Sequence, residues 1–469
     1  MSESAVHVNV LVLGGGPGGY VAAIRAAQLG LSVAIVEREY WGGVCLNIGC
    51  IPTKVLLRHA EVATIVSRQA SLFGLPEGVS ADFTAAHQRS RVVVDGRVKG
   101  VHYLMKKNGI QQFSGTGVFS GLHSLDVSDG EQSVATEITF DHAIIATGSV
   151  IRTIPGVELS ERVTGYTELV LAERMPRRLG IIGAGPIGIE FASIAASFGS
   201  EVTLIEYQDR ILPLEDGEVS AELAKALKKT GMTIVTAARV ESARDAGAAA
   251  EVTYSSNGES TTLEFDHVMV AVGFAPQLDG FGLANTGVAV SEAGAIVIDD
   301  QLRTSVPHFF AIGDVTGKLA LAHVAEAQGI LAAEVIAGET SRTIGDYRMM
   351  PRAVYSLPQV ASFGLTEDQA RDEIGDVIVA KFPFVANGKA HAFGETHGFV
   401  KLIADARTRQ LVGGHLIGPE VSELLPELTL AAQQGITIDD LVLNVHAHPT
   451  LNESLQEAFH GLAGHMINF

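Results

Sequence analysis

The sequence predicts an α/β protein in which two similar nucleotide-binding units precede an α+β region, and three observations support this fold class. A glycine-rich turn between an apolar strand and a helix occurs near residue 14 and again near residue 183. From about residue 349 onward, no third turn of this kind occurs. The length of 469 residues also exceeds what one hydrophobic core supports, so several domains are expected.

The first repeat has the order strand, glycine turn, helix, strand and acidic residue. Strands are predicted over residues 8–13 and 31–36 with a helix over residues 20–29 between them, and Glu37 follows the second strand. The glycines of this GxGxxG turn are Gly14, Gly16 and Gly19. Such glycines admit a pyrophosphate to the helix N-terminus, and the acid accepts hydrogen bonds from a ribose. The first repeat therefore predicts a dinucleotide site.

The second repeat has the same order and predicts a second dinucleotide site. Strands are predicted over residues 179–182 and 202–205, a helix ends near residue 198, and Glu206 closes the repeat. Its turn glycines are Gly183, Gly185 and Gly188. Because a carboxylate at Glu206 repels the 2′-phosphate of NADP, NAD is favoured here. Arg210 is interpreted as a solvated or salt-bridged residue.

Three further apolar strands run into small residues, at residues 143–148, 268–273 and 309–314. The second strand closes the inserted repeat and the third returns to the opening domain, so the second unit is expected to be inserted into the first. Asp314 ends the third strand, where it either accepts from a ribityl hydroxyl of FAD or caps the next helix. The expected domains are residues 1–149 with 275–348, residues 150–274, and residues 349–469.

The only two cysteines, Cys45 and Cys50, lie between the first glycine turn and a predicted helix. With four residues between them, they reach disulfide geometry only if the backbone turns tightly, which Gly49 permits. A disulfide across so short a loop removes only about 2 kcal/mol of unfolded-chain entropy. Stabilisation of the fold is therefore a weak reason for a disulfide at this place. The pair is therefore interpreted as a redox dithiol, and the alternative is two buried, inert cysteines.

Cys50 is the better thiolate candidate of the two. Pro52 fits the first turn of a helix through residues 55–57, so Cys50 is expected near the positive end of that helix. Lys54 follows one turn later and could hold its ammonium near the same charge or near an electron-rich cofactor ring.

Charge and cysteine content limit the functional classes. Asp and Glu number 53 against 33 Lys and Arg, and the net charge of -20 disfavours nucleic acid and anionic lipid as partners. No basic and apolar leader is evident, and no apolar run reaches the roughly 18 uncharged residues of a membrane span. A cytoplasmic protein is expected, in which closely spaced cysteines favour catalysis over scaffolding.

The C-terminal region combines predicted strands at residues 399–403 and 411–417 with a histidine motif. His446 and His448 precede Glu453, and a carboxylate five residues after His448 could orient an imidazole base for dithiol oxidation. The two histidines could instead be metal ligands, but no other cysteine or acidic cluster completes a zinc set, so no metal is expected. A structural histidine is the remaining alternative.

Taken together, these motifs resemble those of the class I pyridine nucleotide-disulfide oxidoreductases, and within them the dihydrolipoamide dehydrogenases. The resemblance covers essentially all 469 residues. Besides the two glycine turns, it rests on residues 42–52, residues 311–314, and residues 446–450 with Glu453. It implies two Rossmann-like domains, one for FAD and one for NAD, and a C-terminal α+β dimerisation domain.

The resemblance also implies roles for individual residues. Cys45 exchanges with the substrate dithiol, Cys50 lies against the flavin, and His448 is the catalytic base oriented by Glu453. The positions implied to contact FAD are Gly14, Gly16, Gly19, Glu37, Lys54, Gly117, Asp314 and Ala322. The positions implied for NAD are Gly183, Gly185, Gly188, Glu206, Val240 and Gly273, with Glu190 near Lys54 and the nicotinamide.

The implied activity is oxidation of dihydrolipoyl groups with reduction of NAD. The implied partners are the lipoyl domains of 2-oxo acid dehydrogenase complexes or of the glycine-cleavage system. The implied assembly is a homodimer in which His448 serves the disulfide of the other subunit. Two alternatives are a flavin-bearing structural subunit without turnover and a flavin reductase that acts on other disulfides or quinones.

Overall fold

The computed structural model describes residues 6–128 and 136–469, and the chain forms two compact units. The first unit comprises Met1–Val55, Gln88–Arg152 and Gly273–Tyr347. The second unit comprises Leu56–His87, Thr153–Val272 and Arg348–Phe469. Each unit is therefore built from three separate stretches of chain.

The first unit contains a seven-stranded sheet with the order β3-β2-β1-β6-β5-β4, in which β17 also pairs with β6. Its central strand β1 runs parallel to β2 and β6, and residues such as Val10 and Leu11 are fully buried, as expected of a strand covered on both faces. The strands are β1 (Val6–Leu13), β2 (Val33–Glu37), β3 (Gln111–Ser114), β4 (Thr116–Phe119), β5 (Ser124–Ser128), β6 (Thr136–Ile145) and β17 (Phe309–Ala311). A separate antiparallel pair consists of β7 (Ser149–Ile151) and β16 (Phe274–Pro276).

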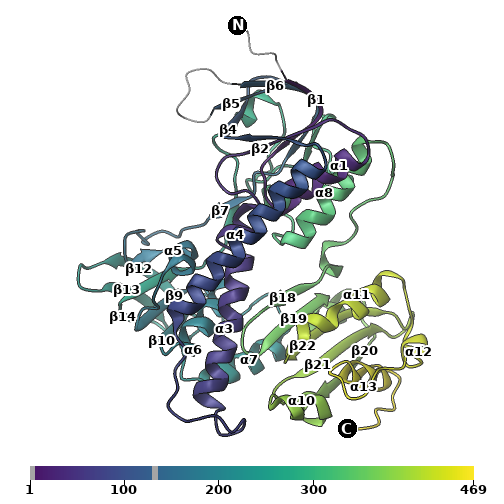
Figure 1. Cartoon of the computed structure of the whole chain (residues 1–469). Helices are drawn as coiled ribbons and strands as arrows, with labels where there is room; N and C mark the ends of the chain where they lie inside the picture. Colours follow the sequence, from purple (N-terminus) through teal and green to yellow (C-terminus); the bar gives the residue numbers. More distant parts are fainter. Residues whose placement is uncertain (1–5, 129–135) are drawn as a thin grey trace. The chain divides into compact units, whose positions relative to one another are not determined.

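Helices α1 (Pro17–Gln28) and α8 (Ala322–Ile336) lie side by side in the first unit (Figure 1). The lack of a side chain at Gly329 permits their close approach, because a Cβ there would lie only 2.5 Å from the carbonyl oxygen of Gly18. α1 begins at Pro17 rather than at the predicted residue 20, since proline fits the first helical position. Other helical segments that lie wholly or mainly in this unit are α2 (Gly43–Asn47), α4 (Phe83–Lys107), η1 (Leu283–Asn285) and η2 (Gly313–Thr316), and η3 (Tyr347–Met349) begins at the last residue of the unit.

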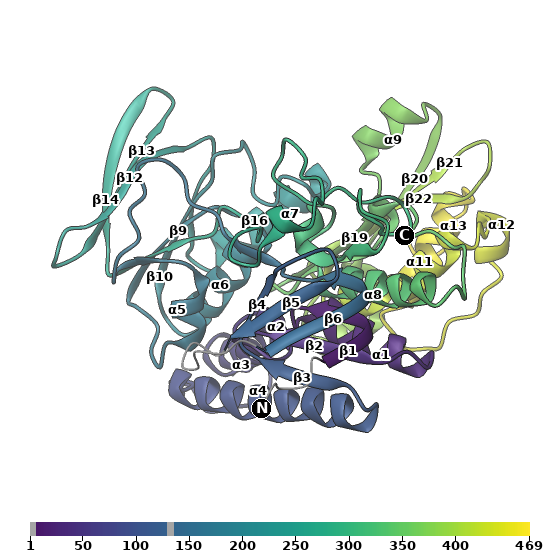
Figure 2. The same ribbon diagram turned by 90° about the horizontal axis from the view of Figure 1, so that it is seen from above.

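The second unit contains three sheets. Their strand orders are β11-β10-β9-β15-β8, which is parallel, and β12-β13-β14 and β18-β19-β22-β21-β20, which are antiparallel. Figure 2 shows the β13–β14 hairpin extending beyond β9 and β10. The strands are β8 (Val163–Thr164), β9 (Arg178–Ile182), β10 (Glu201–Ile205), β11 (Thr233–Val235), β12 (Arg239–Asp245), β13 (Ala250–Ser256), β14 (Glu259–Phe265), β15 (His267–Val270), β18 (Arg352–Val354), β19 (Gln359–Gly364), β20 (Val377–Pro383), β21 (Phe399–Asp405) and β22 (Leu411–Gly418).

Most helices of the second unit alternate with its strands along the chain, whereas α3 precedes them all and begins in the first unit. The helices of this unit are α3 (Cys50–Arg68), α5 (Tyr166–Leu171), α6 (Pro186–Ser197), α7 (Gly217–Lys229), α9 (Glu367–Glu373), η4 (Phe384–Ala386), α10 (Gly388–Phe393), η5 (Val421–Leu424), α11 (Leu425–Gln433), α12 (Ile438–Leu441) and α13 (Glu453–Leu462). Within residues 6–128 and 136–469, no helix is both long and apolar enough to cross a membrane.

The C-terminal sheet carries α11 and α13 and forms its own core (Figure 1). Phe363, Phe382, Leu428 and Phe459 are each at most 2% exposed in this core. The strands predicted at residues 399–403 and 411–417 are confirmed as β21 and β22. The predicted fold class, α/β with two domains of the dinucleotide-binding type and a C-terminal α+β region, is confirmed.

Residues 56–87 group with the second unit, although they fall within residues 1–149, the first part of the expected FAD-binding domain that residues 275–348 complete; that domain division stays a prediction. The reason for the grouping is that the end of α3 binds α6. Thr64 Oγ1 lies 3.0 Å from Ser197 Oγ, and the Arg68 guanidinium donates to the carbonyl oxygen of Ala196 at 3.3 Å. These contacts join residues far apart in sequence, which local patterns do not reveal.

Candidate active site

The three glycines of the first turn have different structural roles. A Cβ on Gly14, whose φ is +110°, would lie 2.2 Å from the carbonyl oxygen of Ala146, and a Cβ on Gly19 would lie 1.9 Å from that of Gly14. Backbone packing therefore excludes side chains at these two positions. A Cβ on Gly16 would meet only Gly43 Cα, at 3.9 Å, so this glycine leaves the N-terminus of α1 open. A pyrophosphate fits such an opening.

The second turn repeats these roles. A Cβ on Gly183 would lie 2.4 Å from the carbonyl oxygen of Ala271, and a Cβ on Gly188 would lie 2.1 Å from that of Gly183. In contrast, a Cβ on Gly185 would meet nothing within 4 Å. The second turn therefore also combines two glycines required by packing with one that faces open space at a helix N-terminus.

Replacement of Gly185 by valine is expected to weaken NADH binding by at least about tenfold without unfolding the protein, because the new side chain would occupy the approach to the helix N-terminus. Binding is measured by titration of NADH, with the melting temperature recorded alongside. Gly188→Val is the matched control: it adds the same side chain where the backbone leaves no room, so it should lower the yield of folded protein. Unchanged NADH affinity in Gly185→Val would contradict a dinucleotide site at this turn.

The acid of each repeat is fixed by its own glycine turn. Glu37 Oε2 accepts from the Gly15 N–H at 2.6 Å, and Glu206 Oε2 accepts from the Ala184 N–H at 2.6 Å. In both residues Oε1 accepts from the backbone N–H two positions further along, at 2.8 Å. Because a carboxylate has about four acceptor sites, each acid keeps capacity for ribose hydroxyls while its position is set by the backbone.

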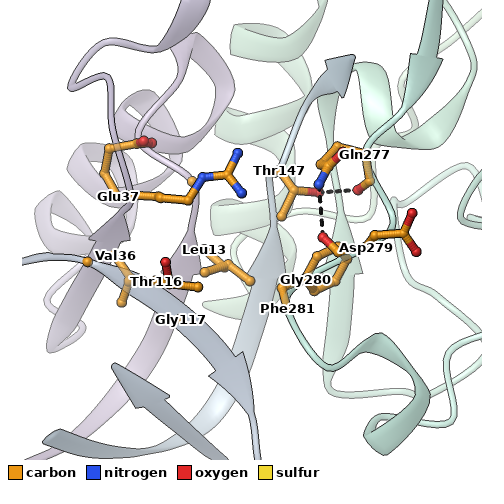
Figure 3. Close-up of a pocket in the computed structure, with 13 residues that line it drawn as sticks. Leu13, Val36, Glu37, Thr116, Gly117, Thr147, Gln277, Asp279, Gly280 and Phe281 are labelled. Atoms are coloured by element: carbon orange, nitrogen blue, oxygen red, sulfur yellow. Dashed lines mark hydrogen bonds between the residues drawn. The ribbon is translucent and has the colours of Figure 1, made fainter. Parts of the chain in front are cut away.

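A cavity of about 80 Å³ lies at the carboxyl ends of β1 and β2 (Figure 3). It brings together Gly14, Glu37 and Gly117, three of the positions implied for FAD. Residues 277–281 form another wall, and Thr147 Oγ1 donates to the first carbonyl oxygen of that segment at 2.9 Å. Sequence reasoning missed this wall because the segment has no glycine fingerprint; its position just after the inserted repeat is the only signal.

Asp314 lies in η2, directly after β17, and accepts from Ser149 Oγ at 2.7 Å. Burial raises the pKa of the Asp314 carboxyl, and the hydrogen bond from Ser149 opposes this effect. The alternative role of Asp314 as a helix cap is wrong, because α8 begins at Ala322 and its N-cap is Leu321. Ala322, another position implied for FAD, is thus the first residue of α8.

The cysteine segment is attached to the first glycine turn by two glycines. Gly42 has a φ of +88° and donates its N–H to the carbonyl oxygen of Gly15 at 2.9 Å. Gly43 has a φ of +69°, and a Cβ there would lie 2.6 Å from Gly16 Cα. Since only glycine suits both the left-handed backbone and this close approach, α2 with Cys45 packs directly against the turn.

Cys45 and Cys50 are half-buried thiols that contact each other. The hydrogen bond to Cys50 raises the pKa of the Cys45 thiol, burial and the charge of Cys50 act in the same direction, and Lys54 opposes them. A negative charge on Cys50 thus opposes ionisation of Cys45. Cys50 is also the first residue of the 19-residue helix α3, whose N-terminal dipole favours a thiolate. The partial exposure of both thiols and their mutual contact favour a redox dithiol over two buried, inert cysteines.

His448 lies in the loop before α13 and is oriented by a carboxylate on that helix. Its Nδ1 lies 2.8 Å from Glu453 Oε1, and Glu453 Oε2 accepts from the Thr450 N–H at 2.8 Å. Burial opposes ionisation of Glu453, but the hydrogen bonds from Thr450 and His448 outweigh it and lower the pKa of this carboxyl. A carboxylate at Nδ1 holds the proton there, so Nε2 of the 79% exposed imidazole is left to accept another.

His446 has a different environment. Its side chain is 5% exposed, and its Nε2 lies 3.0 and 3.1 Å from the two carboxylate oxygens of Glu427. The hydrogen bond to Glu427 raises the pKa of His446 despite burial. His446 and His448 thus face different carboxylates, and within the described residues no three or more His, Cys, Asp or Glu side chains are grouped to hold a metal ion. Burial and the ion pair with Glu427 favour a structural role for His446.

Replacement of Glu453 by glutamine is expected to lower the turnover number by about 100-fold or more, because an amide can donate to Nδ1 and stabilise the wrong tautomer of His448. Steady-state rates with dihydrolipoamide and NAD measure the effect. Glu427→Gln is the control, since it changes the carboxylate beside His446 and should leave the turnover of the folded enzyme within about threefold. Equal losses in both variants would argue against a role for Glu453 in orienting the base.

The remaining site predictions fall in different units. Glu190 is 4% exposed on α6 and accepts from the Tyr355 N–H at 3.0 Å, and Val240 lies on β12. Both residues belong to the second unit, whereas Lys54 and Gly273 belong to the first. The approach of Glu190 to Lys54, and the grouping of Gly273 with the second glycine turn, remain predictions.

Comparison with known proteins assigns these features to one family. The family described as pyridine nucleotide-disulphide oxidoreductase matches residues 8–329, and the dimerisation domain of the same family matches residues 350–459. The two matches together cover most of the chain. The chain therefore belongs to the pyridine nucleotide-disulphide oxidoreductase family.

Similar proteins cover the chain from end to end. It is 55% identical over 466 residues to the dihydrolipoyl dehydrogenase of Mycobacterium tuberculosis, across 99% of this chain and 100% of that protein. It is 52% identical over 467 residues to that of Corynebacterium glutamicum, across 99% of each. Among solved structures, the HOCl-induced flavoprotein disulfide reductase RclA from Escherichia coli has a TM-score of 0.86 at 30% identity, covering 96% of this chain and 99% of that one. LpdA from Mycobacterium tuberculosis has a TM-score of 0.89 at 26% identity, covering 98% and 100%.

Proposed function

We propose that this protein is an FAD-dependent dihydrolipoyl dehydrogenase, which oxidises protein-bound dihydrolipoamide through Cys45 and Cys50 and reduces NAD to NADH. The observation that carries the proposal is the placement of the cysteine pair. Cys45 lies on a helix packed against the first glycine turn, and Cys50 opens α3. The 55% identity to a dihydrolipoyl dehydrogenase over the whole chain supports the choice of substrate.

The two glycine turns fit FAD and NAD. In the first, the opening at Gly16 and the fixed carboxylate of Glu37 suit the pyrophosphate and ribose of FAD. In the second, Gly185 and Glu206 offer the same features to NAD, and the Glu206 carboxylate repels the extra phosphate of NADP. When bound, FAD supplies the two-electron carrier that connects the cysteine pair with NAD.

The thiol chemistry is performed by the residues of this chain. In the oxidised enzyme, a disulfide joins Cys45 and Cys50. His448 Nε2 accepts the proton of one substrate thiol, the resulting thiolate attacks Cys45 Sγ, and the sulfur–sulfur bond breaks with Cys50 leaving as a thiolate. The second substrate thiol then attacks the mixed disulfide, which releases the oxidised lipoyl group, and its proton passes to Cys45. The dithiol now holds two electrons, with the charge on Cys50 stabilised by α3.

The assembly and partners are part of the same proposal. The match of residues 350–459 to a dimerisation domain supports a homodimer. We propose that in this dimer His448 serves the disulfide of the other subunit. The lipoyl domains of 2-oxo acid dehydrogenase complexes, or of the glycine-cleavage system, supply the dithiol.

Initial-rate kinetics test the proposed function. Because the cysteine pair is reduced and oxidised in separate half-reactions, double-reciprocal plots with dihydrolipoamide and NAD both varied are expected to give parallel lines. NADP in place of NAD should support little turnover. Intersecting lines would indicate that both substrates must bind before any product leaves, which contradicts the relay through Cys45 and Cys50.

A further inference from the structure

A row of polar residues crosses the whole C-terminal sheet, with one residue on each strand from β18 to β20. The row consists of Arg352, Ser362, His415, Lys401 and Lys381, each the cross-strand partner of the one before it. Cross-strand partners project from the same face of a sheet, so the row lies on one face. Ser362, His415 and Lys401 are at most 2% exposed. A buried polar row requires polar partners from another element.

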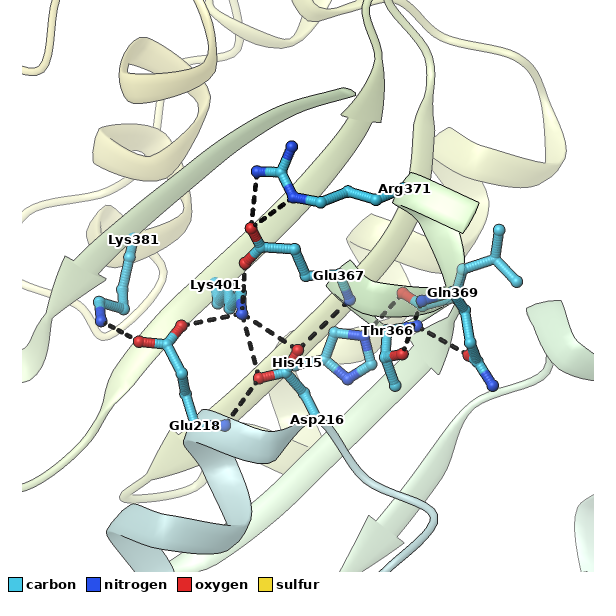
Figure 4. A network of polar contacts seen from close by, with 10 residues as sticks. Asp216, Glu218, Thr366, Glu367, Gln369, Arg371, Lys381, Lys401 and His415 are labelled. Atoms are coloured by element: carbon cyan, nitrogen blue, oxygen red, sulfur yellow. Dashed lines mark hydrogen bonds and ion pairs between the residues drawn. The ribbon is translucent and has the colours of Figure 1, made fainter. Parts of the chain in front are cut away.

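Lys401 is the centre of this row and binds three carboxylates (Figure 4). Its Nζ lies 3.0 Å from Asp216 Oδ2, 2.8 Å from Glu218 Oε2 and 2.8 Å from Glu367 Oε2. Glu218 also accepts from Lys381 at 2.5 Å, and Glu367 from Arg371 at 2.7 Å. An ammonium has three donors, so those of Lys401 are fully used, and it is the cation shared by all three acids.

Two of these acids belong to the start of α7, which follows the second repeat. Asp216 is the N-cap of α7, and its Oδ1 accepts from the Glu218 N–H at 3.0 Å. Its side chain is 4% exposed and faces Lys401. Ser220, one turn into α7, donates its hydroxyl to the carbonyl oxygen of Leu212 at 3.2 Å. Lys401 therefore fixes the end of α7 that contacts the segment between Glu206 and the helix.

That segment leads directly to the second glycine turn. Leu212 is 2% exposed with a φ of +43°, a conformation that a leucine keeps only when its surroundings hold it. Its N–H donates to the carbonyl oxygen of Ala184 at 2.9 Å, and the Ala184 N–H holds Glu206 Oε2 at 2.6 Å. A continuous path of polar contacts thus connects Lys401 with the carboxylate at the second dinucleotide site.

We infer that Lys401 is a positioning residue for NAD: by clamping the N-terminus of α7, it sets the Ala184 peptide and the Glu206 carboxylate that meet the NAD ribose. The inference rests on the proposed function, in which the second glycine turn binds NAD. Without Lys401, the buried carboxylate of Asp216 would lose its cation, and Glu218 and Glu367, which keep Lys381 and Arg371, would no longer be joined to it. The start of α7 would then move away from the C-terminal sheet. The contact of Ser220 with Leu212 would transmit this shift to the turn.

Lys401→Met tests the inference in the dimeric holoenzyme, with Lys381→Met as its matched control. Lys381 lies on the neighbouring strand, binds the same Glu218, and is 46% exposed. We expect Lys401→Met to weaken NADH binding and raise the KM for NAD by about tenfold, with Lys381→Met within about twofold of wild type. Anaerobic reduction of the flavin by dihydrolipoamide, which does not use the second turn, should keep its wild-type rate. Lys401→Arg should recover much of the NADH affinity.

Ser220→Ala provides a second test that leaves every charge in place. It cuts the path between α7 and Leu212, and should weaken NADH binding by about threefold with the same flavin reduction rate. If Lys401→Met does not fold, the NADH affinity of Ser220→Ala alone tests the inference. Wild-type NADH affinity in the folded variants would overturn the inference, and so would equal losses in NADH binding and flavin reduction. Failure of dihydrolipoamide to reduce the flavin of the wild-type enzyme would instead overturn the proposed function.

Discussion

Cys45→Ser is expected to lower dihydrolipoamide-dependent NAD reduction by more than about 1,000-fold, since a hydroxyl cannot form the mixed disulfide. The fold should be retained because serine is close to cysteine in size and Cys45 is only half-buried. NADH-driven reduction of an artificial quinone should persist in the same variant, because electrons can leave the flavin without the cysteine pair. Both activities are measured spectrophotometrically on one preparation.

This variant also separates the enzyme from a structural subunit. If the protein only docked other enzymes in a complex, Cys45→Ser would leave the overall reaction of the complex unchanged. On the proposed mechanism, the complex assembles but its lipoyl groups remain reduced. Normal turnover of a complex that contains Cys45→Ser would contradict the relay.

The second large effect is expected at His448. His448→Gln should lower kcat/KM for dihydrolipoamide by about 1,000-fold, because the variant loses the imidazole that Glu453 orients to take the thiol proton. Quinone reduction by NADH should be little changed in this variant. If quinones were the true acceptor of the enzyme, its physiological reaction would therefore not depend on His448. His446→Gln is the matched control. Its imidazole is buried against Glu427, so this variant should lose stability rather than turnover.

Mixing inactive subunits tests where His448 acts. If His448 serves the disulfide of the other subunit, a mixed dimer of Cys45→Ser and His448→Gln has one fully intact site. Random exchange of equal amounts should then restore about a quarter of the wild-type activity. No recovery after proven exchange would place His448 and the disulfide of one site in the same subunit.

The features that were predictable from sequence are those fixed by neighbouring residues. Gly19 is required by a contact with Gly14 in its own repeat, and the position of Cys50 follows from the helix that begins there. His448 and Glu453 are also close in sequence, so their pairing could be anticipated. Local spacing was sufficient because a helix or a turn carries the geometry.

Other parts depend on contacts between distant segments. The wall of the first cavity at residues 277–281 has no motif, and the contact of α3 with α6 joins residues far apart in sequence. Lys401 is an ordinary lysine in the sequence, and only the pairing of β21 and the approach of α7 and α9 give it three carboxylates. Such sites are invisible to periodicity because tertiary packing creates them.

The central claim, a relay from dihydrolipoamide through the cysteine pair to NAD, is tested most directly by an anaerobic visible spectrum. The wild-type protein and Cys50→Ser are titrated with dihydrolipoamide and then with NAD. We predict a long-wavelength band that appears with dihydrolipoamide, disappears with NAD and is absent from Cys50→Ser, because it requires the Cys50 thiolate beside the flavin. A flavin spectrum that does not respond to dihydrolipoamide would contradict the account.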